Sequence, residues 1–357
     1  MTGRIPVAVL GAGGYIGQHF VRLLADHPDF ELRVLTGGPR STHLRLRELW
    51  RISEEPPSSV GDAKLASASP AALERAGVRL VFIALPSGAA GAVEEELTRR
   101  GLHVFSNASD HRGDRDVPLL VPEVNAPHLL ALRRKGRAVW VTNPNCTATG
   151  LVLALAPVWR SLDPRAVHVT TYQALSGAGI PGVASLEATD NVIPFIAGEE
   201  EKVVRESRRI LGELRGRSVR SSQVPFVVQC ARVPVRDGHL EAVTLETSGP
   251  VRTEELLDRW REFDPLVGLD LPTAPHPPVV VRTEGDRPQP LLDRWAGSPP
   301  RARGMAVSVG RVRWDPPYLR FFLLSHNAVR GGAGGSVLNA ELARAHGYFD
   351  GEPGASG

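Results

Sequence analysis

Apolar and polar positions in the first half of the chain follow a repeating strand–helix rhythm. Residues 5–10 form a short apolar run, and residues 15–25 then have helical spacing, with Ile16, Phe20 and Leu23 on one face. Continuous apolar runs are typical of strands covered on both faces. The pattern recurs and predicts a helix at 88–100 and strands at 31–36, 80–85, 103–107 and 138–142. This alternation predicts a Rossmann-like, doubly wound parallel sheet in an α/β domain.

The pattern changes after residue 147. Alanine and leucine dominate a helical stretch at 147–159, and a charged amphipathic helix is predicted at 199–211. Strand-like runs then predominate, at 167–173, 226–235, 239–247, 305–312 and 318–324. Strands grouped apart from helices predict an α+β domain whose sheet is largely antiparallel. The proline-rich stretch 271–300 is too long for a plain connector, so we predict an irregular but structured surface loop or arm there.

The length of 357 residues favours two domains, because single hydrophobic cores stop growing at about 250–300 residues. We predict a nucleotide-binding domain over residues 1–146, completed by a C-terminal helix at 336–346 within residues 331–350. A catalytic and dimerisation domain is predicted over 147–330, and a flexible tail over 351–357.

Composition narrows the class of protein. The net charge of +3 is small and spread along the chain, so a nucleic-acid-binding surface is not expected. Two cysteines, Cys146 and Cys230, are too few for a disulfide scaffold. No secretory leader is apparent, and no apolar stretch reaches the roughly 20 residues of a membrane helix. These features predict a reduced, cytoplasmic protein that binds neither nucleic acid nor membrane.

A glycine-rich turn lies between the first predicted strand and the first predicted helix. It reads Gly11-Ala12-Gly13-Gly14-Tyr15-Ile16-Gly17. Such glycines let the backbone turn tightly and approach a pyrophosphate at the helix N-terminus. A glycine pattern alone is weak evidence, but its place between strand and helix strengthens it. A dinucleotide is the expected ligand, and a flexible turn without a ligand is the alternative interpretation.

The end of the second predicted strand bears on the choice of cofactor. Enzymes that bind NAD often place a carboxylate there for the ribose hydroxyls. Here the chain has no carboxylate and reads Thr36-Gly37-Gly38-Pro39-Arg40-Ser41. Arg40 and Ser41 are suited to bind a 2′-phosphate through charge-assisted hydrogen bonds, which favours NADP. An exposed loop arginine is the alternative in this arginine-rich chain.

Cys146 is the candidate nucleophile. It lies in Asn143-Pro144-Asn145-Cys146-Thr147, directly before a predicted helix, where free amides and the helix dipole stabilise a thiolate. Polar and turn-forming residues surround it. Cys230 lies instead in an apolar strand and is expected to be structural. A cysteine nucleophile also needs a partner for proton transfer.

The turn between two predicted strands offers that partner. His239 follows Val235-Arg236-Asp237-Gly238, and Arg232 lies seven residues before it on the incoming strand. A hairpin of this kind can place a base and a carboxylate-binding arginine side by side. The chain has 11 histidines, so the residues alone only suggest His239.

Four segments resemble the aspartate-semialdehyde dehydrogenases of the archaeal and fungal type. They are residues 143–148 (NPNCTA), 172–179 (YQALSGAG), 232–239 (RVPVRDGH) and 325–331 (SHNAVRG). The resemblance extends from Gly11 to Leu342, and the cysteine and Gln173 segments are its most specific parts. The related N-acetyl-glutamyl-phosphate reductases have a glycine before the cysteine, where this chain has Asn145. Glycines within 331–335 replace alanines common in the family, which implies a looser start for the last helix.

The resemblance implies a role for each matching residue. Cys146 is the expected nucleophile, Gln173 orients the substrate, and His239 is the general acid and base. Arg232 is expected to pair bidentately with the substrate α-carboxylate. The other implied substrate contacts are Glu199 for the amino group, Arg112 and Lys202 for phosphate, Ser176 and Gly177. The implied cofactor contacts are Asn327 near the nicotinamide, Pro86 and Ser87, besides the glycine turn. Without the resemblance, Arg112, Glu199 and Lys202 are ordinary surface residues.

The implied reaction is the NADPH-dependent reduction of L-aspartyl-4-phosphate to L-aspartate-4-semialdehyde through a thioester on Cys146. Such an oxidoreductase belongs to the biosynthesis of lysine, threonine and methionine, and the resemblance implies a homodimer or homotetramer. Two alternatives stay open. One is a reductase of an acyl-CoA such as malonyl-CoA on the same scaffold. The other is a non-catalytic NADP-binding sensor.

Overall fold

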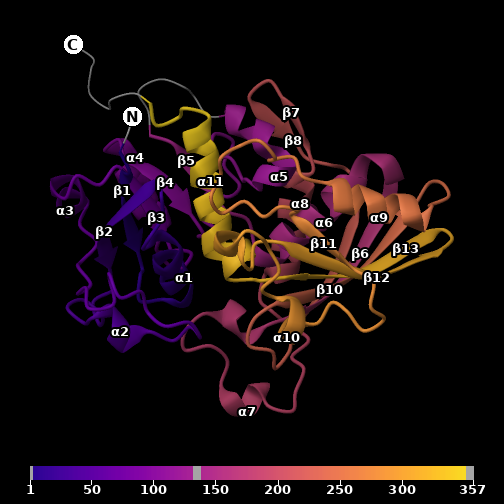
Figure 1. Cartoon of the computed structure of the whole chain (residues 1–357), viewed down its shortest axis with the longest axis horizontal. Helices are drawn as coiled ribbons and strands as arrows, with labels where there is room; N and C mark the ends of the chain where they lie inside the picture. Colours follow the sequence, from indigo (N-terminus) through magenta and orange to yellow (C-terminus); the bar gives the residue numbers. More distant parts are fainter. Residues whose placement is uncertain (1–2, 132–137, 351–357) are drawn as a thin grey trace.

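The computed structural model describes residues 3–131 and 138–350, and it is built on two separate sheets (Figure 1). The first sheet has five strands in the order β2-β1-β3-β4-β5, and all its pairings are parallel. Its strands are β1 (Ile5–Leu10), β2 (Phe30–Thr36), β3 (Leu80–Ile83), β4 (His103–Ser106) and β5 (Trp140–Thr142). The predicted doubly wound parallel sheet is confirmed.

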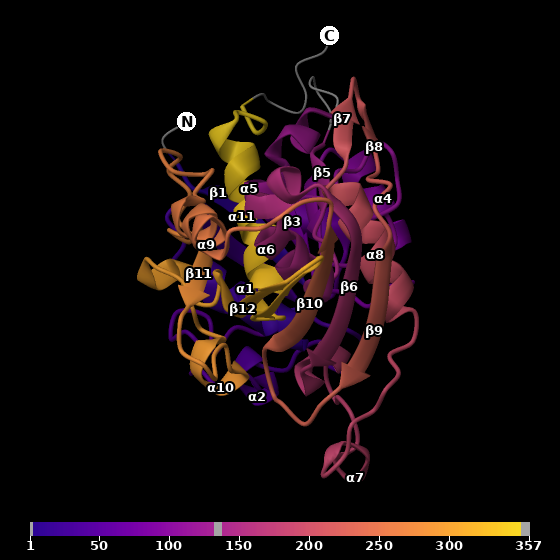
Figure 2. The same cartoon turned by 90° about the vertical axis from the view of Figure 1, so that its right-hand side faces the viewer.

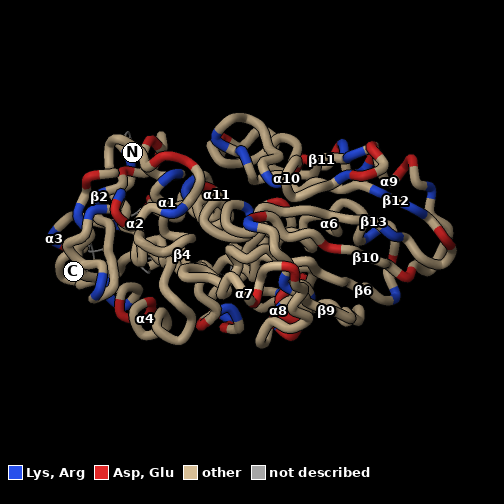
Figure 3. The backbone as a smooth tube through the Cα atoms, turned by 90° about the horizontal axis from the view of Figure 1, so that it is seen from below, with Lys and Arg blue, Asp and Glu red and all other residues tan. Residues whose placement is uncertain are grey.

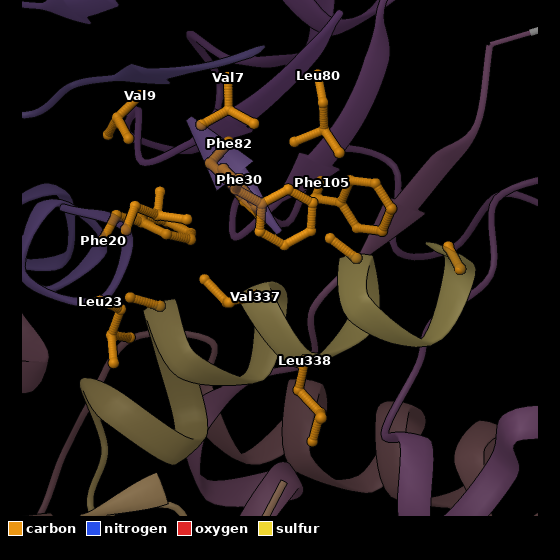
Figure 4. Close-up of a cluster of buried hydrophobic side chains, with 14 of the residues drawn as sticks. Val7, Val9, Phe20, Leu23, Phe30, Leu80, Phe82, Phe105, Val337 and Leu338 are labelled. Atoms are coloured by element: carbon orange, nitrogen blue, oxygen red, sulfur yellow. The ribbon is translucent and has the colours of Figure 1, made fainter. Parts of the chain in front are cut away.

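Helices cover both faces of this parallel sheet. On one face lie α1 (Tyr15–Leu24) and the C-terminal α11 (Gly334–Ala345), and on the other lie α3 (Pro70–Arg75) and α4 (Gly91–Arg99). Figure 4 shows Phe82, Phe30 and Phe105 of the sheet meeting Phe20 of α1 and Val337 of α11. Each fully buried aromatic or aliphatic side chain stabilises the fold by roughly 1.5–3 kcal/mol. This core therefore ties the end of the chain to its beginning.

The glycine-rich segment before α11 is closely packed. It forms a kinked turn over Val329–Ala333, in which Gly332 has non-helical angles (φ −139°, ψ −116°), and α11 begins two residues earlier than predicted. A side chain at Gly331 would meet Cβ of Cys146 at 2.6 Å, and one at Gly335 would meet Oδ1 of Asn143 at 2.5 Å. These glycines let the turn approach the nucleophile segment closely, although the backbone is kinked at Gly332.

The second sheet has six strands in the order β11-β12-β13-β10-β6-β9. The three central pairings are antiparallel, whereas β6 pairs with β9 and β11 with β12 in parallel. The strands are β6 (Pro164–Gln173), β9 (Phe226–Arg232), β10 (His239–Thr247), β11 (Val279–Arg282), β12 (Val307–Asp315) and β13 (Tyr318–Ser325). The predicted second domain with a largely antiparallel sheet is confirmed, although the sheet is mixed.

The stretch 271–300 departs from the prediction of irregular structure. It contains β11 at the edge of the second sheet and the short helix α10 (Pro290–Asp293). The valines at 279–281 have high strand propensity, and this run pairs with β12 despite the prolines around it. Prolines are compatible with an edge strand because one side of such a strand needs no ladder hydrogen bonds.

Three helices pack on the inner face of the second sheet. They are α6 (Cys146–Leu162), α8 (Glu199–Ile210) and α9 (Thr253–Glu262). Figure 2 shows β10, β6 and β9 in front of α6, with the α7 segment projecting below. The remaining short elements are α2 (Leu46–Leu49), α5 (Pro122–Asn125), η1 (Ala126–Ala131), η2 (Leu175–Ala178), α7 (Ser185–Ala188), β7 (Glu213–Arg215), β8 (Ser218–Arg220) and η3 (Pro300–Ala302).

Charged residues are distributed over the whole molecule. Figure 3 shows Lys and Arg interspersed with Asp and Glu along the tube of both halves. Within residues 3–131 and 138–350, no helix has the length and apolar character needed to cross a membrane. The tail predicted to be flexible, 351–357, lies outside the described residues.

Candidate active site

Cys146 is the first residue of α6, where the two domains meet. The preceding strand β5 ends at Thr142, and Asn143–Pro144 lead into the helix. Asn145 is the N-cap, and its Oδ1 accepts the amide protons of Thr147 and Ala148 at 2.9 and 3.1 Å. An asparagine cap of this kind satisfies amides that the first helical turn leaves free. The predicted position of Cys146 at a helix N-terminus is confirmed.

His239 lies directly beside the cysteine. Its Nε2 atom is 3.2 Å from Sγ of Cys146, and the ring is fully buried at the start of β10. On the other side of the ring, the amide of Ala174 donates a hydrogen bond to Nδ1 at 3.0 Å. Because Nδ1 accepts a hydrogen bond from the backbone, the neutral ring carries its own proton on Nε2. His239 therefore presents an N–H group to the sulfur.

Burial keeps this pair of side chains neutral. Burial and the negative charge of Glu199 together raise the pKa of the Cys146 thiol to about 12, although Arg232 and Arg112 act in the opposite direction. Burial, together with the positive charge of Arg232, lowers the pKa of His239 to about 3. Without a bound ligand, these surroundings favour the neutral thiol over the thiolate that a helix N-terminus favours. The thiol must therefore lose its proton during the reaction.

Arg232 and Gly177 lie on the same side of His239. Arg232, at the end of β9, donates from Nη1 to the carbonyl of Ala174 at 2.8 Å and is largely buried. Burial lowers the pKa of its guanidinium. A side chain at Gly177 would lie 2.7 Å from Nη1 of Arg232 and about 3.3 Å from the His239 ring. Gly177 therefore leaves this approach to the arginine and the histidine open.

Glu199 joins three residues of the cluster. Its Oε1 atom accepts hydrogen bonds from Nδ2 of Asn145 at 2.9 Å, Nε2 of Gln173 at 3.1 Å and Oγ1 of Thr147 at 3.4 Å. Its Oε2 atom bonds to no residue within 3–131 and 138–350. The structure thus places a nearly buried carboxylate, with one oxygen free, close enough to Cys146 to raise the pKa of its thiol.

The two cations predicted to bind phosphate differ in their surroundings. Arg112 is largely buried and donates to Oε1 of Glu206 at 3.1 Å and to the carbonyl of Asn107 at 2.7 Å. Lys202 is half-buried on the first turn of α8 and makes no ion pair with a described residue. Only Arg112 is held in a defined place by protein partners.

Asn327 is tied to the turn that carries His239. Its Oδ1 accepts the amide proton of Gly238 at 2.9 Å, and its Nδ2 donates to Oγ of Ser176 at 2.8 Å. The neighbouring Asp237 accepts a hydrogen bond from the hydroxyl of Tyr15 at 2.6 Å. Since Tyr15 is the first residue of α1, the glycine turn and the catalytic turn are directly connected.

The glycine turn has the shape that a pyrophosphate site requires. Gly11 has φ +82°, and a side chain there would meet the carbonyl oxygen of Ala84 at 2.6 Å. A side chain at Gly17 would lie 2.7 Å from Cα of Ala12. Gly13 and Gly14 complete the turn, and Gly14 is the N-cap of α1. The turn lies at the carboxyl end of β1, where the strand order reverses, and such switch points bind ligands in open α/β sheets.

The other predicted cofactor residues follow the carboxyl ends of neighbouring strands. Arg40 is exposed after β2, and Ser41 donates from Oγ to the carbonyl of Gly38 at 3.2 Å. Pro86 and Ser87 are exposed after β3, and Oγ of Ser87 accepts the amide proton of Ser109 at 3.1 Å. These residues surround the glycine turn on the same edge of the sheet.

Three residues in and around the site were not predicted from the sequence: Glu206, Asp237 and Gly331. Glu206 accepts the backbone amide proton of Asn145 at 2.6 Å. The spacing of Glu206 from Glu199 could have indicated this contact, because helix positions seven apart share one face. Asp237 and Gly331 lay inside segments already singled out, but nothing in their spacing indicated these contacts. Within the described ranges, no three His, Cys, Asp or Glu side chains form a possible metal site.

Comparisons with known proteins cover nearly the whole chain. The NAD binding domain of semialdehyde dehydrogenases matches residues 6–132, and their dimerisation domain matches residues 155–330. An aspartate-semialdehyde dehydrogenase of Archaeoglobus fulgidus is 45% identical over 348 residues, 95% of this chain and 98% of that relative. A malonyl CoA reductase (NADP) of Metallosphaera sedula is 39% identical over 98% of this chain and 99% of its own.

A solved structure is similar over the same extent. The crystal structure of aspartate-semialdehyde dehydrogenase with NADP from Candida albicans has a TM-score of 0.84 and 32% sequence identity. The match covers 97% of this chain and 100% of that one.

Proposed function

The chain belongs to the semialdehyde dehydrogenase family, and from this premise we propose that it reduces L-aspartyl-4-phosphate to L-aspartate-4-semialdehyde with NADPH. Family membership confirms the resemblance found in the sequence. One observation carries the proposal: the 3.2 Å contact of Cys146 Sγ with His239 Nε2, beside Arg232 and Glu199. This arrangement offers a nucleophile, a donor to the sulfur, a cation for a carboxylate and an anion for an ammonium group.

NADP is the proposed cofactor. Family membership supports a nicotinamide dinucleotide, and a relative from Candida albicans was solved with NADP. Within this chain, the glycine turn is shaped for the pyrophosphate, and Arg40 and Ser41 offer a cation and a hydroxyl for a 2′-phosphate. When bound, the cofactor supplies the hydride. Both the oxygen and the nitrogen of the Asn327 side-chain amide are hydrogen-bonded within the protein. Asn327 would form part of the protein surface facing the nicotinamide.

The proposed reaction begins with attack of the Cys146 sulfur on the acyl carbon. The carbon–sulfur bond forms, the bond between the acyl carbon and the phosphate oxygen breaks, and the thiol proton leaves with the phosphate. Hydride then adds to the thioester carbon, and the resulting oxyanion collapses to the aldehyde and expels the sulfur as a thiolate. Solvent returns one proton to the thiolate. The thioester divides one difficult step into two easier ones.

His239 stabilises the sulfur in this scheme without changing its own protonation. The hydrogen bond from Ala174 to Nδ1 leaves no room for a second ring proton at that atom. Nε2–H can donate a hydrogen bond to the sulfur whenever negative charge develops there, as the thiol loses its proton and again as the aldehyde leaves. We therefore propose that His239 acts as a fixed hydrogen-bond donor to the sulfur, in place of the general acid and base that the family resemblance implies.

Glu199 supports an amino-acid substrate over an acyl-CoA. Its Oε2 accepts no hydrogen bond from a described residue and is not fully buried, so it is open to a ligand. The α-ammonium group of an aspartyl substrate would neutralise this carboxylate and remove its upward effect on the thiol pKa. Malonyl-CoA has no such ammonium group. The Metallosphaera sedula relative nevertheless keeps an acyl-CoA reductase as the second candidate.

We also propose that the chain pairs with a second copy through its second domain. That domain matches a family described as a dimerisation domain. Large apolar side chains are exposed there: Tyr172 and Val227 on the sheet, Leu186 in α7 and Phe195 after it, with Leu186 93% and Phe195 71% exposed. Exposed apolar side chains of this kind are typical of protein interfaces.

The direct test of the reaction is the reverse assay. Purified protein is mixed with aspartate-4-semialdehyde, inorganic phosphate and NADP, and NADPH formation is followed by absorbance. We expect phosphate-dependent turnover that is lost in Cys146→Ala and faster than turnover of malonate semialdehyde with CoA and NADP. Faster CoA-dependent turnover would instead support the acyl-CoA reductase, and wild-type rates in Cys146→Ala would refute the covalent route.

A further inference from the structure

Helix α8 directs two carboxylates at the nucleophile segment. Glu199 and Glu206 are seven residues apart, about two helical turns, so their side chains share one face of the helix. Both are buried, and both bond to Asn145, the residue before Cys146: Glu199 to its side chain and Glu206 to its backbone amide. The helix therefore holds Asn145 at two separate points.

The bond from Glu206 is the one that fixes the backbone. Its Oε2 accepts the amide proton of Asn145 at a donor–acceptor distance of 2.6 Å, inside a site where Glu206 is 1% exposed. Bonds between an ionised acceptor and a buried amide are about twice as strong as neutral ones. The next residue is Cys146, so the place of this amide sets where the sulfur stands relative to His239.

The same carboxylate holds Arg112. Nη1 of Arg112 donates to Oε1 of Glu206 at 3.1 Å, and Nη2 donates to the carbonyl of Asn107 at 2.7 Å. Arg209, one turn further along α8, donates to the backbone carbonyls of Arg112 and Val117. Helix α8 thus fixes both the guanidinium and the loop that carries it.

Two buried donors remain unused in that loop. Nε of Arg112 and Nδ2 of Asn107 have no hydrogen-bond partner among residues 3–131 and 138–350. Buried polar groups are normally paired, and an unpaired one destabilises the fold. Both atoms are donors, one of them on a cation, so an oxyanion such as a phosphate group is the ligand that would satisfy them.

We propose that Glu206 is a positioning residue that aligns Cys146 through the Asn145 amide and presents Arg112 to the phosphate group of the substrate. This inference rests on the proposed function, because it assumes that the acyl group arrives as a phosphate. Glu206 itself touches neither the sulfur nor the phosphate. Its effect on phosphate passes through Arg112, and its effect on the sulfur passes through Asn145.

Two substitutions separate these effects. Glu206→Gln keeps an oxygen that can accept the Asn145 amide proton, but it turns an NH2 group toward the guanidinium of Arg112. Two donors then face each other, so Arg112 is displaced. We expect the KM for phosphate in the reverse assay to rise about tenfold, the KM for the semialdehyde to stay within about twofold, and kcat to stay within about threefold. Glu206→Ala also removes the acceptor for Asn145, and its kcat should fall about tenfold or more.

A double-substitution cycle tests whether Glu206 acts through Arg112. In an Arg112→Ala background, Glu206→Gln should change the KM for phosphate by less than about twofold, because the partner is already absent. Glu201→Gln, an exposed carboxylate on the same helix, is the matched control and should leave all three constants unchanged. An unaltered phosphate KM in Glu206→Gln, or an equal effect in the Arg112→Ala background, would overturn the proposal.

A second measurement needs no turnover and so separates this inference from the proposed function. Inorganic phosphate is titrated while the alkylation rate of Cys146 by iodoacetamide is measured at alkaline pH. We expect phosphate to slow alkylation in the wild type and about tenfold more phosphate to be needed in Glu206→Gln. A protein that shows this shift but no reductase activity would contradict the proposed function alone. Absence of protection in the wild type, or equal protection in both proteins, would contradict the role of Glu206.

Discussion

The amide of Ala174 decides how His239 can act, because it occupies Nδ1 and leaves the ring proton on Nε2. If His239 is a fixed donor to sulfur, a glutamine that offers an amide N–H in its place should retain part of the activity. One fixed donor to a developing anion is worth about 100-fold in rate. We therefore predict that kcat of His239→Gln exceeds that of His239→Ala at least about tenfold.

The two variants are compared in the reverse assay at saturating substrates, with thermal melting curves to show equal folding. Equal inactivity of His239→Gln and His239→Ala would mean that the ring must exchange a proton. That result would restore the acid and base role and contradict the tautomer assigned from the Ala174 contact.

Glu241 is a buried acid that the proposed reaction does not use. It lies on β10, one inward-facing position after His239, and neither carboxyl oxygen has a hydrogen-bond partner among the described residues. Burial raises its pKa well above the ordinary value, and the nearby Glu199 charge adds to this. The folded state therefore keeps a proton that the unfolded state loses above pH of about 4.3, so stability falls as pH rises.

Glu241→Gln should remove this decrease of stability with rising pH, because glutamine carries no titratable proton. We predict that the variant has a higher free energy of unfolding than the wild type, and that the difference grows between pH 5 and 8. The growth should be about 1.4 kcal/mol for each pH unit, up to the pKa of Glu241 in the folded state. Urea unfolding at several pH values measures it, and Glu262→Gln on the exposed side of α9 is the control. A difference that does not change with pH would contradict the neutral carboxyl.

Residue types and local segments allowed some site residues to be predicted and not others. Cys146, His239 and Arg232 stood in short segments whose neighbours indicated their chemistry. The neighbours of Glu206 and Glu241 in the sequence do not distinguish them from other glutamates in helices and strands. Their surroundings come from α6 and the loop 107–112, which are distant in the chain, so burial and partners were decided only by tertiary packing.

At the scale of elements, the start of α6 depends on a glycine in another segment. Gly331, in the kinked turn Val329–Ala333, lies very close to Cys146. A methyl group on Gly331 would meet Cβ of Cys146 at 2.6 Å and its Cα at 2.7 Å. Neither the turn that carries Gly331 nor the start of α6 can move easily, because both are backbone segments packed in the buried interior. We predict that Gly331→Ala lowers kcat about 100-fold by displacing the sulfur and destabilises the fold by about 1–3 kcal/mol.

Gly249→Ala is the matched control, because a methyl group at that position would have no other atom within 4 Å and the φ of Gly249 is not positive. Reverse-assay kinetics and urea unfolding of both variants check the prediction. Full activity in Gly331→Ala would show that the turn can yield without moving the nucleophile.

Most elements followed directly from periodicity, but their sheet partners did not. The strands of the first sheet and the helices α1, α6 and α8 were predicted within a few residues of their observed bounds. The strand β11 was not, because prolines surround its short valine run and local propensity favoured a loop. Its pairing with β12 is a long-range contact that only the assembled sheet provides.

At the scale of the whole molecule, the site exists only where the two sheets meet. Cys146 follows β5, the last strand of the parallel sheet, whereas Arg232 ends β9 and His239 begins β10 of the mixed sheet. The bond between Tyr15 and Asp237 adds a direct link from the glycine turn to the catalytic turn. Both domains must therefore be in place for the nucleophile, its donor and the cofactor to meet.

The exposed apolar side chains of the second domain lead to a prediction about assembly. We expect sedimentation velocity to show a dimer or a larger oligomer at micromolar concentration. Val227→Arg, which puts a charge on a strand side chain that is 51% exposed, should weaken it and shift the protein toward the monomer. Leu291→Arg, also exposed but on α10 away from that sheet face, is the control. A wild-type monomer at all concentrations would contradict the proposed pairing.

The central claim is that Cys146 carries the acyl group between phosphate and hydride transfer. It is tested most directly by mixing the enzyme with aspartate-4-semialdehyde and NADP while leaving phosphate out. We predict a burst of one NADPH per active site, and mass spectrometry should find an aspartyl group on the peptide that contains Cys146. Steady NADPH formation without an adduct, or an adduct on Cys230 instead, would contradict the account.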